Sequence, residues 1–191
     1  SIAILMNVGR ALITEVREGT LESTLVSPFN IVYYYLGIFL EQFVRTFLEF
    51  LFSYIIAILL GADLQQITLL ILLLGFLYVS ICSFSMGVFL SNIMLWFRDT
   101  FISQNTIFLI IFLVSGITFP IELLPKFLRV ISNFIPLTYS IKAIRTLYLE
   151  TQTSMINLSF IQGLLLSILY FLIGILVYNK VEKKIVSDVS Y

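Results

Sequence analysis

The sequence predicts an all-α fold, a polytopic bundle of transmembrane helices. Sixty per cent of the 191 residues are hydrophobic and 12% are charged, whereas soluble domains usually carry about 25% charged residues. Three long intervals, residues 64–97, 100–121 and 151–179, contain no charged side chain. Each can hold a helix of the roughly 20 residues needed to cross a bilayer. Backbone groups in lipid must pair within their own segment. We therefore expect most of this chain to lie in the lipid bilayer and to form helices there.

The first part of the chain is expected to hold the end of one span, an acidic segment and one long helix. Residues 1–12 have the pattern of the end of a membrane helix, and we expect earlier helices of a longer protein to precede them. Residues 13–28, here called the acidic segment, end at Pro28, and proline disfavours helix at the residue before it. Residues 31–60 have a helical pattern for about 45 Å, longer than the hydrocarbon core. We therefore place residues 31–40, with three successive tyrosines, at the membrane interface.

The second part is expected to hold three further membrane helices. Residues 67–91 and 101–117 form two of them, with residues 92–100 as the loop between. Prolines interrupt residues 118–150, here called the proline segment, whose pattern is amphipathic. Residues 160–178 form the last span, and the charged residues 179–191 form a tail.

Lysine and arginine residues near the spans suggest an orientation, because they are enriched on the cytoplasmic side. If the acidic segment is cytoplasmic, that side holds six basic residues and the other side four. The dense group Lys180, Lys183 and Lys184 beside the last span adds to the cytoplasmic side. We therefore expect the acidic segment and the tail in the cytoplasm and the proline segment outside.

The acidic segment has the most specific pattern. At 100° per residue Glu15, Glu18 and Glu22 fall within about 60° of one another on a helix, while apolar side chains such as Val16 lie outside this arc. One interpretation is a solvated connector, and the other is a docking helix that presents carboxylates to a soluble partner. Gly19 costs about 1 kcal/mol against alanine inside a helix, so we expect the helix to be weak there.

Two motifs in this sequence resemble those of the type-2 permeases of ATP-binding-cassette (ABC) exporters. The first resembles that family's cytoplasmic coupling segment, and it consists of Glu15, Glu18, Gly19, Thr20, Leu21 and Glu22, followed by Ser27-Pro28. The second resembles its outer re-entrant segment, and it consists of Gly116, Phe119, Pro120, Pro125, Pro136, Thr138, Tyr139 and Arg145. The motifs occur in the family's order and, with the spans between them, cover nearly all of the chain. Such permeases usually have six spans, and we expect the first, with most of the second, to precede residue 1.

The resemblance implies a permease subunit in the cell membrane. Two copies, identical or paralogous, would form the translocation path, and a separate ABC ATPase subunit would bind ATP and magnesium. This chain would carry no cofactor and would not be an enzyme, and it has no G-x-x-x-x-G-K-[ST] phosphate loop because none of its glycines precedes a lysine. The transported substrate stays open.

Other classes of membrane protein make different demands on the sequence. A secondary carrier or channel would need no acidic docking helix and no ATPase. A membrane-embedded transferase would need clustered histidines, aspartates or metal ligands, and the chain has no histidine. The net charge of zero gives no electrostatic reason to expect a nucleic acid as partner.

The proline segment also has a pattern of its own. A helix starting after Pro125 would place Lys126, Arg129 and Asn133 on one side and apolar residues, among them Phe134, on the other. Such a helix lies in a membrane interface or dips back toward it. It could close the outer mouth of a path or contact substrate directly. The triplet at residues 97–99, Phe-Arg-Asp, resembles a loop of polysaccharide-exporting members.

Three charged residues fall inside the long helix at 31–60. Glu41, Arg45 and Glu49 follow one another at intervals of four, which places them on one helical face, and Glu49 would lie about 12 Å deeper than Glu41. Charges at such depth usually face a bundle interior or a cavity. We therefore expect a structural ion pair or part of a substrate path. Cys82 lies in an apolar run, which favours a buried small side chain over a redox or metal site.

Overall fold

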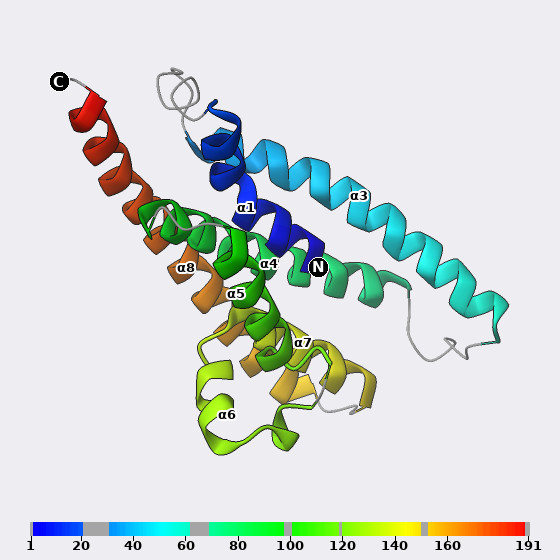
Figure 1. Ribbon diagram of the computed structural model, residues 1–191. Helices are drawn as coiled ribbons and strands as arrows, with labels where there is room; N and C mark the ends of the chain where they lie inside the picture. The colour runs from blue at the N-terminus through cyan, green and yellow to red at the C-terminus, as the bar shows by residue number, and fades with distance from the viewer. Residues whose placement is uncertain are drawn as a thin grey trace.

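A computed structural model of the chain describes residues 2–20, 31–61, 69–97, 101–118, 120–149 and 153–189. All regular elements in these ranges are helices, which confirms the predicted all-α class (Figure 1). In chain order they are α1 (Ile2–Glu18), α3 (Ile31–Leu59), α4 (Leu69–Phe97), α5 (Phe101–Val114), the 3-10 helix η1 (Ile121–Leu123), α6 (Lys126–Ser132), α7 (Pro136–Leu149) and α8 (Thr153–Val189).

Three helices are long and apolar enough to cross a membrane. They are Ile31–Leu59 in α3, Ile71–Trp96 in α4 and Leu158–Glu182 in α8, of 29, 26 and 25 residues. At 1.5 Å per residue each exceeds the roughly 30 Å of a hydrocarbon core. The span expected at residues 101–117 is shorter, because α5 has 14 residues and ends at Val114, which gives it a length of about 21 Å.

Helix α4 lies at the centre of the bundle and packs most extensively against α8 and α1, and also against α7. Glycines bring these helices close together. A Cβ atom at Gly87 would lie 2.9 Å from Cβ of Val8 and 3.2 Å from the carbonyl oxygen of Leu5. A Cβ atom at Gly174 of α8 would lie 3.1 Å from the backbone of Phe89. Membrane helices associate through such small residues, because lipid supplies no hydrophobic drive between them.

Two apolar clusters form the core around α4. One joins α1, α3, α4 and α8 and includes Val8, Tyr35 and Val88. The other joins α1, α4, α5 and α7 and includes Phe108 and Leu137. The first turns of α3 belong to the core cluster. Further along α3, phenylalanine rings as far as Phe50 contact the ring of Phe76 in α4, and the last turns run beside the bundle (Figure 1).

Several expected boundaries were wrong. Residues 92–97 continue α4 and do not form a loop, since the Asn92 amide donates to the carbonyl oxygen of Val88 at 2.9 Å and is therefore satisfied inside a helix. Helix α1 runs without a break from the end of the expected span to Glu18. Tyr33 is exposed, as expected at an interface, but Tyr35 is buried and its hydroxyl donates to Oδ1 of Asn92 at 3.1 Å. Helix α8 continues into the expected tail as far as Val189.

The two sequence motifs occupy opposite ends of the bundle. In Figure 1 the end of α1 and the end of α8 lie at the upper end of the molecule, and η1 and α6 lie at the lower end. Helix α8 is the longest helix in the described part of the chain, with 37 residues.

Candidate functional site

The acidic segment begins as the last turn of α1 and leaves it through a glycine turn. Gly19 has a φ of +73°, in the left-handed region that favours glycine. The Thr20 amide donates to the carbonyl oxygen of Glu15 at 3.0 Å, and the Gly19 amide donates to that of Val16 at 3.4 Å. These two bonds form a Schellman motif, which satisfies carbonyl groups at a helix end. The weak point expected at Gly19 is therefore the end of the helix.

The carboxylate of Glu15 joins two parts of the chain. Its Oε1 atom accepts a hydrogen bond from the hydroxyl of Tyr34, in the first turn of α3, at 3.0 Å. Its Oε2 atom accepts a short hydrogen bond from the hydroxyl of Thr20. Glu15 is half-buried as a result. Sequence periodicity placed Glu15 among docking carboxylates, but the structure shows that this side chain holds the start of α3 against the end of α1.

Glu18 differs from Glu15 although the two are three residues apart. Its side chain is exposed at the last residue of α1. Val16 is also 48% exposed, whereas Ile13 is 8% exposed and belongs to the core. An acidic group and an apolar group therefore stand open at this helix end. Leu21 and Glu22, with the rest of the expected segment to residue 28, lie outside the described residues.

The proline segment is held by an arginine at the end of α5. The Nη2 atom of Arg145, in α7, donates to the carbonyl oxygen of Gly116 at 2.8 Å. Gly116 has a φ of +81° and turns the chain after α5. Both residues belong to the same sequence motif, so the structure brings together two positions that are 29 residues apart. Phe119 lies outside the described residues.

Prolines divide this segment into short helices, as the sequence predicted. Pro120 and Pro125 precede η1 and α6, and Pro136 begins α7, where a missing amide hydrogen costs least. Thr138 is buried in the first turn of α7, and its amide donates to the carbonyl oxygen of Ile135 at 3.0 Å. Tyr139 is half-buried, and its Cβ atom faces Gly163 of α8.

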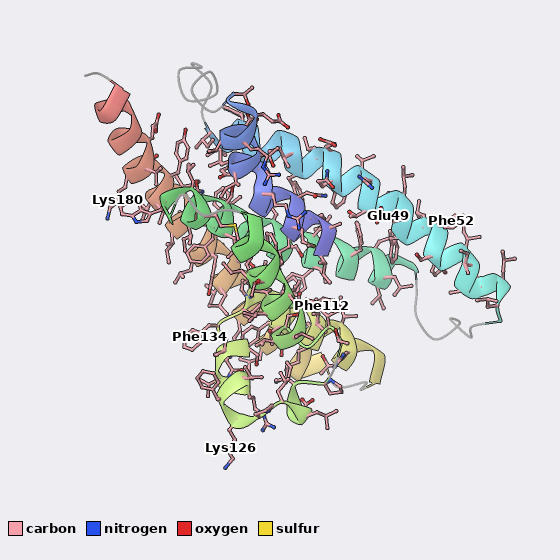
Figure 2. The ribbon with its side chains drawn as sticks, in the orientation of Figure 1. Glu49, Phe52, Phe112, Lys126, Phe134 and Lys180 are labelled. Atoms are coloured by element: carbon pink, nitrogen blue, oxygen red, sulfur yellow. The ribbon has the colours of Figure 1, made fainter. Side chains whose placement is uncertain are left out.

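Helix α6 is open on both of its expected sides. Lys126 and Phe134 point away from the other helices in Figure 2, and Phe127 and Phe134 are 74% and 62% exposed. The Arg129 guanidinium donates to the carbonyl oxygens of Glu122 and Leu124. One of the basic side chains on the expected polar face therefore caps η1.

The charged residues of α3 form an ion pair, but not in the place expected. The Nε atom of Arg45 lies 3.5 Å from Oε1 of Glu49, and Oε1 of Glu41 accepts from the Gln42 amide at 3.5 Å. The side chains of Arg45 and Glu49 are 69% and 59% exposed. We expected them to face the bundle interior; instead they lie on the outer face of α3, as Glu49 and Phe52 do in Figure 2.

Sequence analysis missed polar contacts that bind α3 and α4 to α1. The Asn7 amide donates to Oε1 of Gln42 at 2.6 Å, and the Leu12 amide to the hydroxyl of Ser91 at 3.4 Å. Gln42 and Ser91 are buried. The signal was present, because an amide side chain inside a span usually faces another helix and bonds to it.

A further polar contact joins α4 to α8. The Tyr78 hydroxyl donates to the carbonyl oxygen of Phe160 at 3.1 Å and occupies the place where a Cβ atom of Gly163 would stand, 2.0 Å away. Next to it the Ser167 hydroxyl donates to the sulfur of Cys82 at 3.2 Å. Cys82 is buried, as the apolar run predicted.

Comparison with known proteins identifies the family to which this chain belongs. The family model for the ABC-2 type transporter matches residues 1–149. The chain belongs to the ABC-2 type transporter family. It is similar to the Cyanophora paradoxa protein named "Putative transport permease ycf38", with 28% identity over 193 residues, which covers 94% of this chain and 66% of that protein. The chain thus spans just under two thirds of that relative's length. No solved structure matches it.

Family membership and the three apolar helices together make the chain a multi-pass membrane protein of a transporter family. The ABC-2 match covers both the acidic segment and the proline segment, because it runs from residue 1 to the end of α7. Helix α8 lies beyond the matched residues, and it is the helix that packs most extensively against α4.

Proposed function

We propose that this chain is the membrane-spanning permease subunit of an ABC-type exporter in the cell membrane. Two copies would form the translocation path, and a separate ATPase subunit would bind ATP with magnesium and drive the path between inward-open and outward-open forms. The observation that carries the proposal is the ABC-2 family match over residues 1–149. The similarity to a protein named as a transport permease agrees with it.

The end of α1 suits a contact with a soluble subunit. Glu18 and Val16 are both exposed in the last turn of α1, on different faces, at one end of the bundle. An apolar side chain would supply buried area in a groove of the ATPase, and a carboxylate would supply orientation through a charge-assisted bond. The Schellman turn at Gly19 fixes where the helix stops, so the residues that follow leave α1 at a defined point.

The opposite end suits a closure of the path. Helices η1 and α6 lie at the far end of the bundle from Glu18 (Figure 1). The Arg145 bond to Gly116 and the Arg129 bonds to η1 hold the proline segment as one folded piece. Exposed Phe127 and Phe134 would seal against lipid or another apolar surface and exclude water there.

The ATPase partnership can be tested by charge reversal at the acidic end. The chain with its native flanking sequence should co-purify with a nucleotide-binding protein and alter its ATPase activity. Changing Glu18→Lys together with Glu22→Lys should abolish both effects while leaving membrane abundance unchanged. The control is Glu122→Lys, one charge reversal of the same kind on an exposed residue at the opposite end, which should retain both effects; Glu18→Lys alone is its matched single change.

Two results would count against the proposal. Wild-type protein that transports without any nucleotide-binding partner would establish the carrier or channel alternative. A charge-reversed protein that still binds and stimulates the ATPase would reject the docking role of Glu18 and Glu22. It would instead support the solvated connector, whose exposed ion pairs contribute only about 0 to 1 kcal/mol.

Sidedness has its own test, because Thr20 and Asn133 are both exposed and lie at opposite ends. A cysteine at Thr20 should react in intact cells only with membrane-permeant reagents, and a cysteine at Asn133 should also react with impermeant ones. The reverse pattern would invert the proposed orientation.

A further inference from the structure

The carboxylate of Glu15 has one hydrogen bond to each side of residues 21–30. Thr20, immediately before these residues, donates to Oε2. Tyr34, in the first turn of α3 after them, donates to Oε1 at 3.0 Å. One side chain therefore fixes the point where the chain leaves α1 and the point where it enters α3.

The surroundings of Glu15 distinguish it from a docking carboxylate. Glu15 is half-buried and both of its oxygens accept hydroxyl groups of the same chain, whereas Glu18 on the next turn is exposed. Hydrogen bonds to an ionised carboxylate are shorter and roughly twice as strong as those between neutral groups. A protein that docked on Glu15 would have to break these bonds first.

We propose that Glu15 is a positioning residue that clamps the end of α1 to the start of α3, so that a displacement imposed at the end of α1 reaches α3. The inference rests on the proposed function, because the displacement in question is the one that an ATPase subunit would impose. Without the clamp the end of α1 could move while α3 stayed in place.

The chemistry of the clamp needs a carboxylate and not only a polar group. A carboxylate offers two acceptor oxygens, and each hydroxyl donor takes one. A glutamine at position 15 offers one acceptor oxygen and a donor amide, so it can hold Tyr34 or Thr20 but not both in the same way. Glu15→Gln should therefore keep one of the two hydrogen bonds, and Glu15→Ala should lose both.

The first experiment measures the clamp without reference to any partner. Hydrogen exchange of backbone amides in residues 16–34 is followed in purified protein in lipid nanodiscs. Tyr34→Phe and Thr20→Val each remove one donor hydroxyl and should raise exchange about three- to tenfold, the range that corresponds to one net hydrogen bond. Tyr33→Phe is the matched control, because Tyr33 is 69% exposed beside Tyr34, and it should leave exchange unchanged.

The second experiment measures coupling in complex with the nucleotide-binding protein that co-purifies with the chain. Tyr34→Phe should leave the affinity for that protein unchanged but reduce its permease-dependent ATPase activity at least about threefold. A merely structural role would lower complex yield and activity together. The double variant Glu15→Ala/Tyr34→Phe should lose no more activity than Glu15→Ala, because the second change removes a bond already lost.

The outcomes separate this inference from the proposed function. Unchanged exchange in both Tyr34→Phe and Thr20→Val would overturn the clamp. Raised exchange with full ATPase stimulation would overturn its role in coupling. Failure of the wild-type chain to bind any ATPase would reject the proposed function and the coupling role with it, whereas the exchange result would still decide whether the clamp exists.

Discussion

Helices α3 and α4 are each 29 residues long and both qualify as membrane spans, yet they occupy opposite environments in the bundle. Half of the most apolar stretch of α4 is buried within the described chain, against 11% of that of α3. Hydropathy alone therefore does not tell which helix lies at the centre. Hydropathy shows that both helices can enter lipid. It does not show which of the two the other helices pack against.

Side-chain size accounts for the difference. Helix α4 carries small residues on the faces that meet its neighbours, such as Gly87 toward α1, Gly75 toward α7 and the buried Ser80. The outer face of α3 carries large side chains that are mostly exposed, such as Leu48 (60%) and Phe52 (67%). Backbones approach closely only where side chains are small, so α4 can have neighbours on several sides.

The largest effect should come from filling the closest helix crossing. Gly87→Leu places a large side chain where even a Cβ atom would lie 3.2 Å from the Leu5 carbonyl oxygen, and overpacking a core usually costs about 1 to 3 kcal/mol or more. The matched control is Gly37→Leu in α3, where an added Cβ atom would meet no neighbouring helix or side chain within 4 Å. It should be neutral or stabilise the helix by about 1 kcal/mol.

These two leucine variants can be compared by thermal unfolding in detergent, followed by size-exclusion chromatography. Equal losses of the folded fraction at both positions would show that α3 is packed as closely as α4, and the contrast between the two helices would be lost.

The ion pair on α3 should give the next effect. Arg45→Ala leaves Glu49 without its partner inside a span, and an uncompensated charge near the bilayer centre costs about 3 kcal/mol on insertion scales. The double variant Arg45→Ala/Glu49→Ala should therefore give a higher folded yield than Arg45→Ala alone. If the single change is harmless, the outer face of α3 meets water instead of lipid.

The smallest effect should come from one hydroxyl at the contact between the two helices. Tyr35→Phe removes the bond from α3 to Oδ1 of Asn92 and leaves a buried amide oxygen unsatisfied, which costs about 1 to 2 kcal/mol. Tyr33→Phe, two residues away on the exposed side, should cost nothing measurable. A null result at both positions in unfolding experiments would mean that the Tyr35 bond contributes nothing measurable, and that apolar contacts such as Phe39 with Phe84 hold α3 on α4.

Much of the fold was predictable from the sequence, because long uncharged runs enter lipid and a backbone in lipid must form helices. The uncharged runs predicted helices, and the prolines at 120 and 125 predicted the breaks before η1 and α6. The end of α5 was not predicted, because its apolar run continues to Ile117 while the left-handed turn at Gly116 stops the helix earlier. Local backbone geometry overruled the hydropathy pattern there.

The candidate site was predictable in part. Periodicity grouped Glu15 with Glu18 because it treats a helix as isolated, and it could not know that Tyr34 lies beside Glu15. For the same reason Arg45 and Glu49 were expected in the bundle interior. The four-residue spacing predicted correctly that they share a helical face, but it did not predict whether that face points toward the bundle or away from it. The pairing of Arg145 with Gly116 needed tertiary structure, although both residues were named.

The contact between Tyr78 and Gly163 also limits how α4 and α8 can move. Four residues before and after Gly163 along α8 stand Ser159 and Ser167, so sliding α8 by one helical turn would bring a serine side chain into the space that the Tyr78 ring and hydroxyl fill. Axial slippage is therefore blocked in both directions. Any axial movement of α8 along α4 therefore requires the Tyr78 side chain to leave this space.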